Sequence, residues 1–211
     1  MAEPTPVARS PITPFPPAEV VEGWVVSGRR STSELALTDL TPLAKVAVRA
    51  EPAGPTAQGM AGPPAGMLVT SPVAGEWLVL AEPGEQARVE GWLASLPSGP
   101  EHLVSVVDLT HGRALIRLTG WRAADVLAKE CAVDLGDRGC PDGRALRTAV
   151  AGLAVDVVRD DRAGVPSYLL HCERSSGQYL FDALLDAGAE FGVDVDGFRQ
   201  PGLGTTREGS T

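Results

Sequence analysis

The pattern of apolar and polar residues is clearest between Val104 and Thr119, where it predicts two strands joined by a polar turn. Val104 to Val107 is an apolar, β-branched run of the kind that forms a fully buried strand. From Arg113 to Thr119 polar and apolar residues alternate, which predicts a second strand with one face exposed to water. Gly120 ends this strand, and Trp121 to Glu130 is predicted to form a helix.

Further elements follow on both sides of this frame. A helix is predicted between Pro83 and Leu96 because its apolar residues recur at i, i+3, i+4 and i+7. A last helix is predicted from Ser175, since Ser175 and Gln178 have the spacing of a capping box. The other predicted strands are 67–70, 76–80, 147–150, 153–158 and 165–172. About three helices and seven strands, several joined as hairpins, indicate an α+β fold with mixed or antiparallel sheets.

The chain is expected to contain one folded region between two irregular ends. Residues 1–20 are rich in proline, which donates no backbone hydrogen bond, so we expect a disordered arm. Residues 21–196 form the α+β domain, and residues 197–211 are polar and glycine-rich, as expected of a flexible tail. Within the domain, Glu51–Gly66 is a loop rich in Gly and Pro that we expect to be disordered.

A short repeat suggests that the domain consists of two similar halves. The tripeptide Asp-Leu-Thr occurs at residues 39–41 and again at residues 108–110, and each copy precedes a short strand that contains a basic residue. This repeat suggests the hypothesis of an internal duplication, with halves at residues 21–100 and 101–196.

Composition and charge exclude several classes of protein. The chain has 27 acidic and 18 basic residues, and its net charge of −9 disfavours nucleic acid and membrane surfaces as partners. No apolar run approaches the ~20 residues that span a bilayer, and the first residues do not resemble a secretory signal. Three cysteines, an odd number without metal-ligand spacing, favour a reducing, cytoplasmic location.

The sequence contains no recognisable reaction centre. The histidines His102, His111 and His171 are the only ones, and no two have the spacing of metal ligands, so no metal site is predicted. Cys172 follows His171 directly, and adjacent residues of a strand point to opposite faces, so these two side chains cannot act as a pair. No nucleotide-binding motif is present. We therefore predict no catalytic residue.

One polar turn remains as a candidate binding site. Asp108, Thr110, His111 and Arg113 place a carboxylate, a hydroxyl, an imidazole and a guanidinium within six residues. They could bind a heterocycle or an anionic group. Alternatively, Asp108 stabilises the turn while Arg113 pairs with an acid or contacts a partner. The structural interpretation is favoured because no second cluster completes a site.

Several segments resemble one family. The run V-V-D-L-T-H-G-R-A-L-I-R-L-T-G-W-R-A-A-D-V-L-A-K resembles the D-[LV]-S-H-G-R-x-x-[LI]-R signature of the sarcosine oxidase gamma subunit. The segment L-T-D-L-T-P-L-A-K resembles the opening motif of that family, and E-W-L resembles one of its strands. Two later segments, beginning C-P-D-G-R and S-S-G-Q-Y, resemble its closing part. The resemblance covers Leu35 to Val195, with threonine in place of the usual serine at Thr41 and Thr110.

The resemblance implies a function within a complex. The family is similar to the folate-binding half of glycine-cleavage aminomethyltransferases, which would give two similar, ferredoxin-like halves. It implies a small, non-catalytic structural subunit of a heterotetrameric, flavin-dependent sarcosine oxidase that feeds one-carbon units to tetrahydrofolate. FAD, FMN, NAD and tetrahydrofolate would be held by the larger flavoprotein subunits. The alternative is a stand-alone aminomethyltransferase-like protein that binds tetrahydrofolate itself. We expect the face with Arg113 and Arg117 to form the rim of the partner interface.

Overall fold

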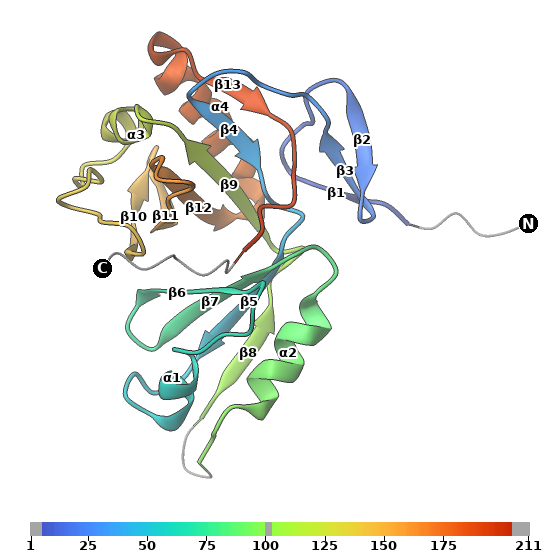
Figure 1. The fold of residues 1–211 in the computed structure, drawn as a ribbon, viewed down its shortest axis with the longest axis vertical. Coiled ribbons are helices and arrows are strands. Elements are labelled where there is room, and N and C mark those ends of the chain that lie inside the picture. Colours follow the sequence, from blue (N-terminus) through green and yellow to red (C-terminus); the bar gives the residue numbers. More distant parts are fainter. Residues whose placement is uncertain (1–5, 100–102, 204–211) are drawn as a thin grey trace, which may run out of the picture. The chain divides into compact units, whose positions relative to one another are not determined.

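The fold was established from a computed structural model, which describes residues 6–99 and 103–203 (Figure 1). The chain forms two compact units, each discontinuous in sequence. The first consists of the residues up to Pro42 together with Gly112–Arg199, and the second of Leu43–His111 together with the residues from Gln200 on. These boundaries differ from the expected halves 21–100 and 101–196, because one sheet of the first unit pairs residues 36–39 with strands that follow residue 112.

The first unit contains a six-stranded sheet and a three-stranded sheet. The larger one has the order β10 (Ala145–Val150), β11 (Leu153–Arg159), β12 (Ser167–Glu173), β9 (Arg113–Thr119), β4 (Ala36–Asp39) and β13 (Asp194–Asp196). Only β13 runs parallel to its neighbour, β4. The smaller sheet has the order β1 (Ala8–Arg9), β3 (Trp24–Ser27) and β2 (Ala18–Val21).

Helices α3 (Ala123–Glu130) and α4 (Gly177–Gly188) share one hydrophobic core with the six-stranded sheet. The core-facing residues alternate along each strand, as Tyr168, Leu170 and Cys172 do in β12. Two short 3-10 helices, Arg174–Ser176 and Ala189–Phe191, flank α4. The predicted capping box is wrong: no side chain caps α4, and Gln178 instead accepts a hydrogen bond from the backbone of Thr13.

The proline-rich segment is part of the first unit. Within the expected disordered arm, residues 6–20 contain β1 and the first residues of β2, and Ile12 is 2% exposed inside the core. Pro11 lies against Gly177, the first residue of α4. A Cβ atom on residue 177 would come within 2.8 Å of the Pro11 ring, so the contact is possible because this residue is a glycine. The expectation of disorder is thus wrong for these residues, because one apolar anchor and the strand pairing hold the segment. Residues 1–5 lie outside the described part.

The second unit is a four-stranded antiparallel sheet with two helices. Its order is β6 (Leu68–Val73), β7 (Glu76–Ala81), β5 (Ala44–Arg49) and β8 (Ser105–Asp108). Helix α1 (Pro55–Gly59) connects β5 to β6, and α2 (Gln86–Ser95) connects β7 to β8. This is the βαββαβ arrangement of a ferredoxin-like fold. The expected disordered loop, Glu51–Gly66, instead contains α1 and buries Met60 in the core of this unit.

Two further expectations about burial and order are corrected. The run Val104–Val107 is not a buried strand, because β8 is exposed along its whole length at the end of the sheet. In the expected flexible tail, Phe198 and Leu203 are buried, while residues 204–211 lie outside the described part. The α+β prediction is confirmed, with four α-helices and thirteen strands among the described residues in place of about three and seven.

Candidate functional site

The turn after β8 contains the predicted candidates, and its polar atoms stabilise the backbone. An oxygen of Asp108 accepts a hydrogen bond from the backbone N–H of Thr110 at 2.8 Å. The hydroxyl of Thr110 accepts one from the N–H of Lys45 at 3.1 Å, and the N–H of Leu109 donates to the carbonyl of Lys45 at 2.8 Å. Since Thr110 is fully buried, its side chain is committed to holding the turn against β5.

The structure brings Asp108 and Thr110 together but uses Arg113 elsewhere. Arg113 is the first residue of β9 in the first unit, where its guanidinium forms an ion pair with Glu173 at 2.7 Å. His111 is exposed at the end of the turn. The structural interpretation is therefore supported for Asp108, Thr110 and Arg113, whereas a binding role for any of the four stays a prediction.

A second turn in the first unit repeats this arrangement. An oxygen of Asp39 accepts from the N–H of Thr41 at 2.9 Å. The hydroxyl of Thr41 accepts from the N–H of Leu115 at 3.2 Å, and the N–H of Leu40 donates to the carbonyl of Leu115 at 2.8 Å. The turn at residues 39–41 thus hydrogen-bonds to β9, which follows the turn at residues 108–110 in sequence. The turn at residues 108–110 hydrogen-bonds to β5, which follows the turn at residues 39–41. The tripeptide repeat was the sequence signal for this pair of turns.

Arg117 is buried, contrary to the prediction that it lies on an exposed interface rim. It is 7% exposed, and it donates hydrogen bonds to the carboxylate of Asp160 at 2.7 Å and to the hydroxyl of Ser167 at 2.7 Å. Burial lowers the pKa of its guanidinium, although Asp160 partly compensates. A buried ion pair with additional hydrogen bonds fixes geometry and adds little net stability.

Arg159 and Tyr168 form a second buried polar cluster. Arg159 is 3% exposed, hydrogen-bonds Asp161, and donates to the Tyr168 hydroxyl at 2.7 Å. Its hydrogen bond to Asp161 raises the pKa of Arg159. Tyr168 donates to the carbonyl of Leu135 at 2.5 Å, and burial raises the pKa of this phenol to about 12. At neutral pH Tyr168 is therefore a hydrogen-bond donor and no general base.

Asp156 links an arginine and a histidine on the side of the sheet opposite the helices. It accepts hydrogen bonds from Arg147 at 2.7 Å and lies 3.3 Å from Nδ1 of His171. Burial of Asp156 opposes its ionisation, but the hydrogen bonds from His171 and Arg147 prevail and lower its pKa. Cys172 points the other way, into the core, where burial raises its pKa to about 11. No His–Cys pair forms, as the alternation of strand residues predicted.

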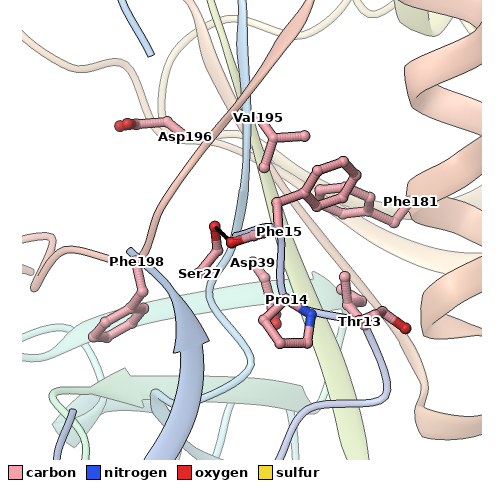
Figure 2. A pocket seen from close by; sticks show the side chains of 10 residues that line it. Thr13, Pro14, Phe15, Ser27, Asp39, Phe181, Val195, Asp196 and Phe198 are labelled. Atoms are coloured by element: carbon pink, nitrogen blue, oxygen red, sulfur yellow. Dashed lines mark hydrogen bonds between the residues drawn. The ribbon is translucent and has the colours of Figure 1, made fainter. Parts of the chain in front are cut away.

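A surface pocket lies within the first unit between the N-terminal segment and α4 (Figure 2). The rings of Phe15 and Phe181 line it with centroids 6.2 Å apart, and the Ser27 hydroxyl donates to the carbonyl of Phe15 at 2.8 Å. Its volume is about 260 Å³ including the part open to solvent. Both of its carboxylates, on Asp39 and Asp196, accept backbone hydrogen bonds.

Within residues 6–99 and 103–203, no three His, Cys, Asp or Glu side chains come together as a metal site would require; His102 lies outside this part. All three cysteines are buried and free. None of the helices in the described part combines the length and the apolar character needed to cross a membrane.

Comparison with known proteins relates this architecture to two classes. The family model of the GCVT N-terminal domain matches residues 64–200. A chain of heterotetrameric sarcosine oxidase from Corynebacterium sp. U-96, solved with pyrrole 2-carboxylate, is 25% identical with a TM-score of 0.62 over 77% of this chain and 88% of its own. The glycine cleavage system aminomethyltransferase T from Bartonella henselae is 16% identical, with a TM-score of 0.63 over 85% of this chain and 55% of its own. This chain thus spans about half of the aminomethyltransferase. The resemblance inferred from the sequence motifs is confirmed.

Proposed function

The chain belongs to the GCVT N-terminal domain family, and from this premise we propose that it is a non-catalytic subunit of a heterotetrameric, flavin-dependent sarcosine oxidase. One observation carries the proposal. The match to the Corynebacterium oxidase extends over 88% of that chain at 25% identity, whereas the match to the aminomethyltransferase extends over 55% at 16%. The oxidase chain therefore resembles this protein over nearly its whole length.

The chemistry of the described residues supports a structural role. The oxygen atoms of Asp108 and Thr110 hold a turn, Arg113 pairs with Glu173, and Arg117 is buried against Asp160. The thiol of Cys172 is buried and largely protonated at neutral pH. These contacts support a structural role for the side chains concerned.

The proposal assigns the redox chemistry to the partner subunits. FAD, FMN, NAD and tetrahydrofolate are held there, and the complex oxidises sarcosine or a related N-methyl amine and passes the one-carbon unit to folate. The three reduced cysteines support a cytoplasmic complex. The net charge of −9 is consistent with protein partners in place of nucleic acid.

Affinity purification of the full chain from its native cells tests this function. We expect stoichiometric recovery of larger subunits with visible flavin absorbance, and sarcosine oxidation by the purified complex but not by the chain alone. A stable, colourless monomer without partners, or oxidation by the isolated chain, would overturn the proposal.

A second candidate is direct binding of tetrahydrofolate, which family membership favours. Titration of the isolated chain with tetrahydrofolate, followed by tryptophan fluorescence, distinguishes the two functions. A saturable change with a stoichiometry of one would support the second candidate. No change at a ligand concentration about 100 times a micromolar Kd, where binding exceeds ~99%, would exclude it.

A further inference from the structure

The edge strands of the described sheets differ in how they are protected from pairing with other chains. Native proteins protect an edge with charge, proline, bulges or short length. The edge β6 contains Pro72 and an irregular register, β10 contains Arg147, and β2 contains Glu19. The edges β1 and β13 have only two and three residues.

The edge β8, like β2, has four residues and one acidic residue, but more large apolar side chains are exposed on and next to β8. Val106 is 42% exposed and Val107 is 48% exposed, and Leu103, two residues before the strand, is 88% exposed. Because consecutive residues point to opposite faces, apolar surface is exposed on both faces of this strand. Three of the nine exposed large apolar residues of the described part lie in this short stretch. Its one charged residue is Asp108, at the last position.

The first unit shows how the corresponding edge is covered. Its strands β11, β12, β9 and β4 follow the same antiparallel order as β6, β7, β5 and β8 in the second unit. The Asp-Leu-Thr turns make β4 the counterpart of β8, since each strand leads into one of them. In the first unit β13 pairs with the outer edge of β4. No strand of the described part pairs with the outer edge of β8.

The hydrogen bonds of the turn indicate which groups of β8 point outward. The backbone N–H of Leu109 donates to the carbonyl of Lys45 in β5. In an antiparallel ladder, every second residue of a strand hydrogen-bonds to a given neighbouring strand, and the residues between them point the other way. Ser105 and Val107 therefore bond to β5, while the backbone N–H and C=O of Val106 point outward. These outward groups suit an added strand.

We propose that the outer edge of β8 binds an extended, apolar segment of a partner subunit, which adds a strand where the first unit has β13. The segment carries a basic residue next to Asp108 and is free of acidic residues opposite Val106 and Val107. A second copy of this chain is a poorer occupant, because each copy has a net charge of −9 and places an aspartate on the edge. The identity of the partner as an oxidase subunit rests on the proposed function, whereas the place of binding rests on β8.

The test compares three variants of the tagged full chain, purified from native cells. Val106→Pro removes the outward N–H without removing a bond to β5, and Val107→Lys adds a charge to the edge. Val20→Lys is the control, because Val20 is 62% exposed on the edge strand β2. Circular dichroism verifies that each variant folds, and hydrogen exchange reports protection of Val106 and Asp108 amides in the isolated chain and in the complex.

We expect both β8 variants to recover flavin-containing subunits on the order of tenfold less than wild type, a loss of about 1.4 kcal/mol. Val20→Lys should recover them normally, and the Val106 amide should be protected only in the complex. Normal recovery by both folded β8 variants would overturn the strand proposal and leave the proposed function standing. Protection in the isolated chain, or a homodimer abolished by Val106→Pro, would assign the edge to this chain itself. A wild-type chain without flavin-containing partners would overturn both.

Discussion

The two Asp-Leu-Thr turns are alike in their hydrogen bonds and differ in their surroundings. In each, the aspartate accepts from the threonine N–H and the threonine hydroxyl accepts from a neighbouring strand. The first turn follows β4, which lies between β9 and β13, and the second follows β8, at the end of its sheet. Thr41 and Thr110 are both fully buried, but Val106 and Val107 next to the second turn are exposed.

The comparison shows that the turn conformation is local while the burial of the adjoining strand is not. Three residues suffice to form the turn, because its hydrogen bonds join groups two residues apart or link it to one neighbouring strand. Whether the preceding strand is buried depends on what pairs with its outer edge. The same local sequence therefore supports an interior strand in one unit and an edge in the other.

The largest loss of stability is expected when Gly120, the residue after β9, is replaced by alanine, the residue found after β5. Gly120 follows β9 at φ +144°, where a Cβ atom would lie 2.3 Å from the carbonyl oxygen of Glu34, whereas Ala50 follows β5. Gly120→Ala should therefore lower the free energy of unfolding by more than about 3 kcal/mol. Urea unfolding followed by circular dichroism measures this loss.

Gly152→Ala is the matched control for Gly120→Ala. Gly152 has φ +76°, and a Cβ atom there would meet no atom within 4 Å. It should cost about 1–2 kcal/mol, the strain of the left-handed conformation alone. Equal losses of unfolding free energy in both variants would show that the carbonyl of Glu34 leaves room for a Cβ atom at residue 120.

The second prediction concerns the paired threonines. Thr41→Val and Thr110→Val each leave a backbone N–H, of Leu115 or Lys45, without its acceptor. Each should destabilise the protein by about 1–3 kcal/mol. Hydrogen exchange should locate the loss of protection in β9 for the first variant and in β5 for the second. Loss in the same strand for both variants would contradict the assignment of one turn to each strand.

The third prediction is a pH dependence that arises in the first unit. The pKa of Asp156 is lowered in the folded state despite its burial, because His171 and Arg147 hydrogen-bond its ionised form. The unfolded chain therefore binds more protons than the folded chain as pH falls below about 4. The resulting stability is present above that pH and is lost as pH falls toward the lowered pKa.

Urea unfolding at a series of pH values between about 5 and 2 measures this dependence, and Asp156→Asn should make it shallower. The exposed ion pair of Arg88 with Glu85 in the second unit provides the comparison. Glu85→Gln should leave the slope nearly unchanged, because exposed pairs contribute little. An unchanged slope in Asp156→Asn would exclude this carboxylate as the source.

The smallest effect is expected at Arg113. Its ion pair with Glu173 is partly exposed, with side chains 31% and 62% accessible, so Arg113→Gln should cost about 0–1 kcal/mol. Thermal unfolding at low and high salt measures it. A loss above about 2 kcal/mol, insensitive to salt, would mean that Arg113 contributes to the fold beyond this pair.

The sequence pattern predicted the positions of elements better than their burial. The strand Arg113–Thr119 was located with its correct bounds, and the helix after Gly120 begins two residues later than expected. Period-two alternation, however, predicts only which face of the sheet a residue lies on. It does not predict what covers that face, and Arg117 is buried. The apolar run at Val104–Val107 indicates a strand but not its neighbours, and here only one neighbour is present among the described residues.

The candidate site was only partly accessible from the sequence. The polar turn and its repeat at Asp39 could be found from three letters, because their bonding is local. The cluster of Arg159, Asp161 and Tyr168 could not, since it depends on the pairing of β11 with β12. The burial of Ile12 could not be predicted either. A proline-rich composition favours disorder, but one apolar residue that packs in the core is enough to order the segment.

The pairing of β4 with strands that come much later in the sequence also limits how the gene can be subdivided. The family match covers residues 64–200, which omit β5 and β4. β5 is the central partner of both β7 and β8, and β4 joins β9 to β13. A recombinant fragment cut at the ends of that match would lack one interior strand in both the four-stranded and the six-stranded sheet. The first unit cannot be produced as a portable module without β4, which comes from the other end of the chain.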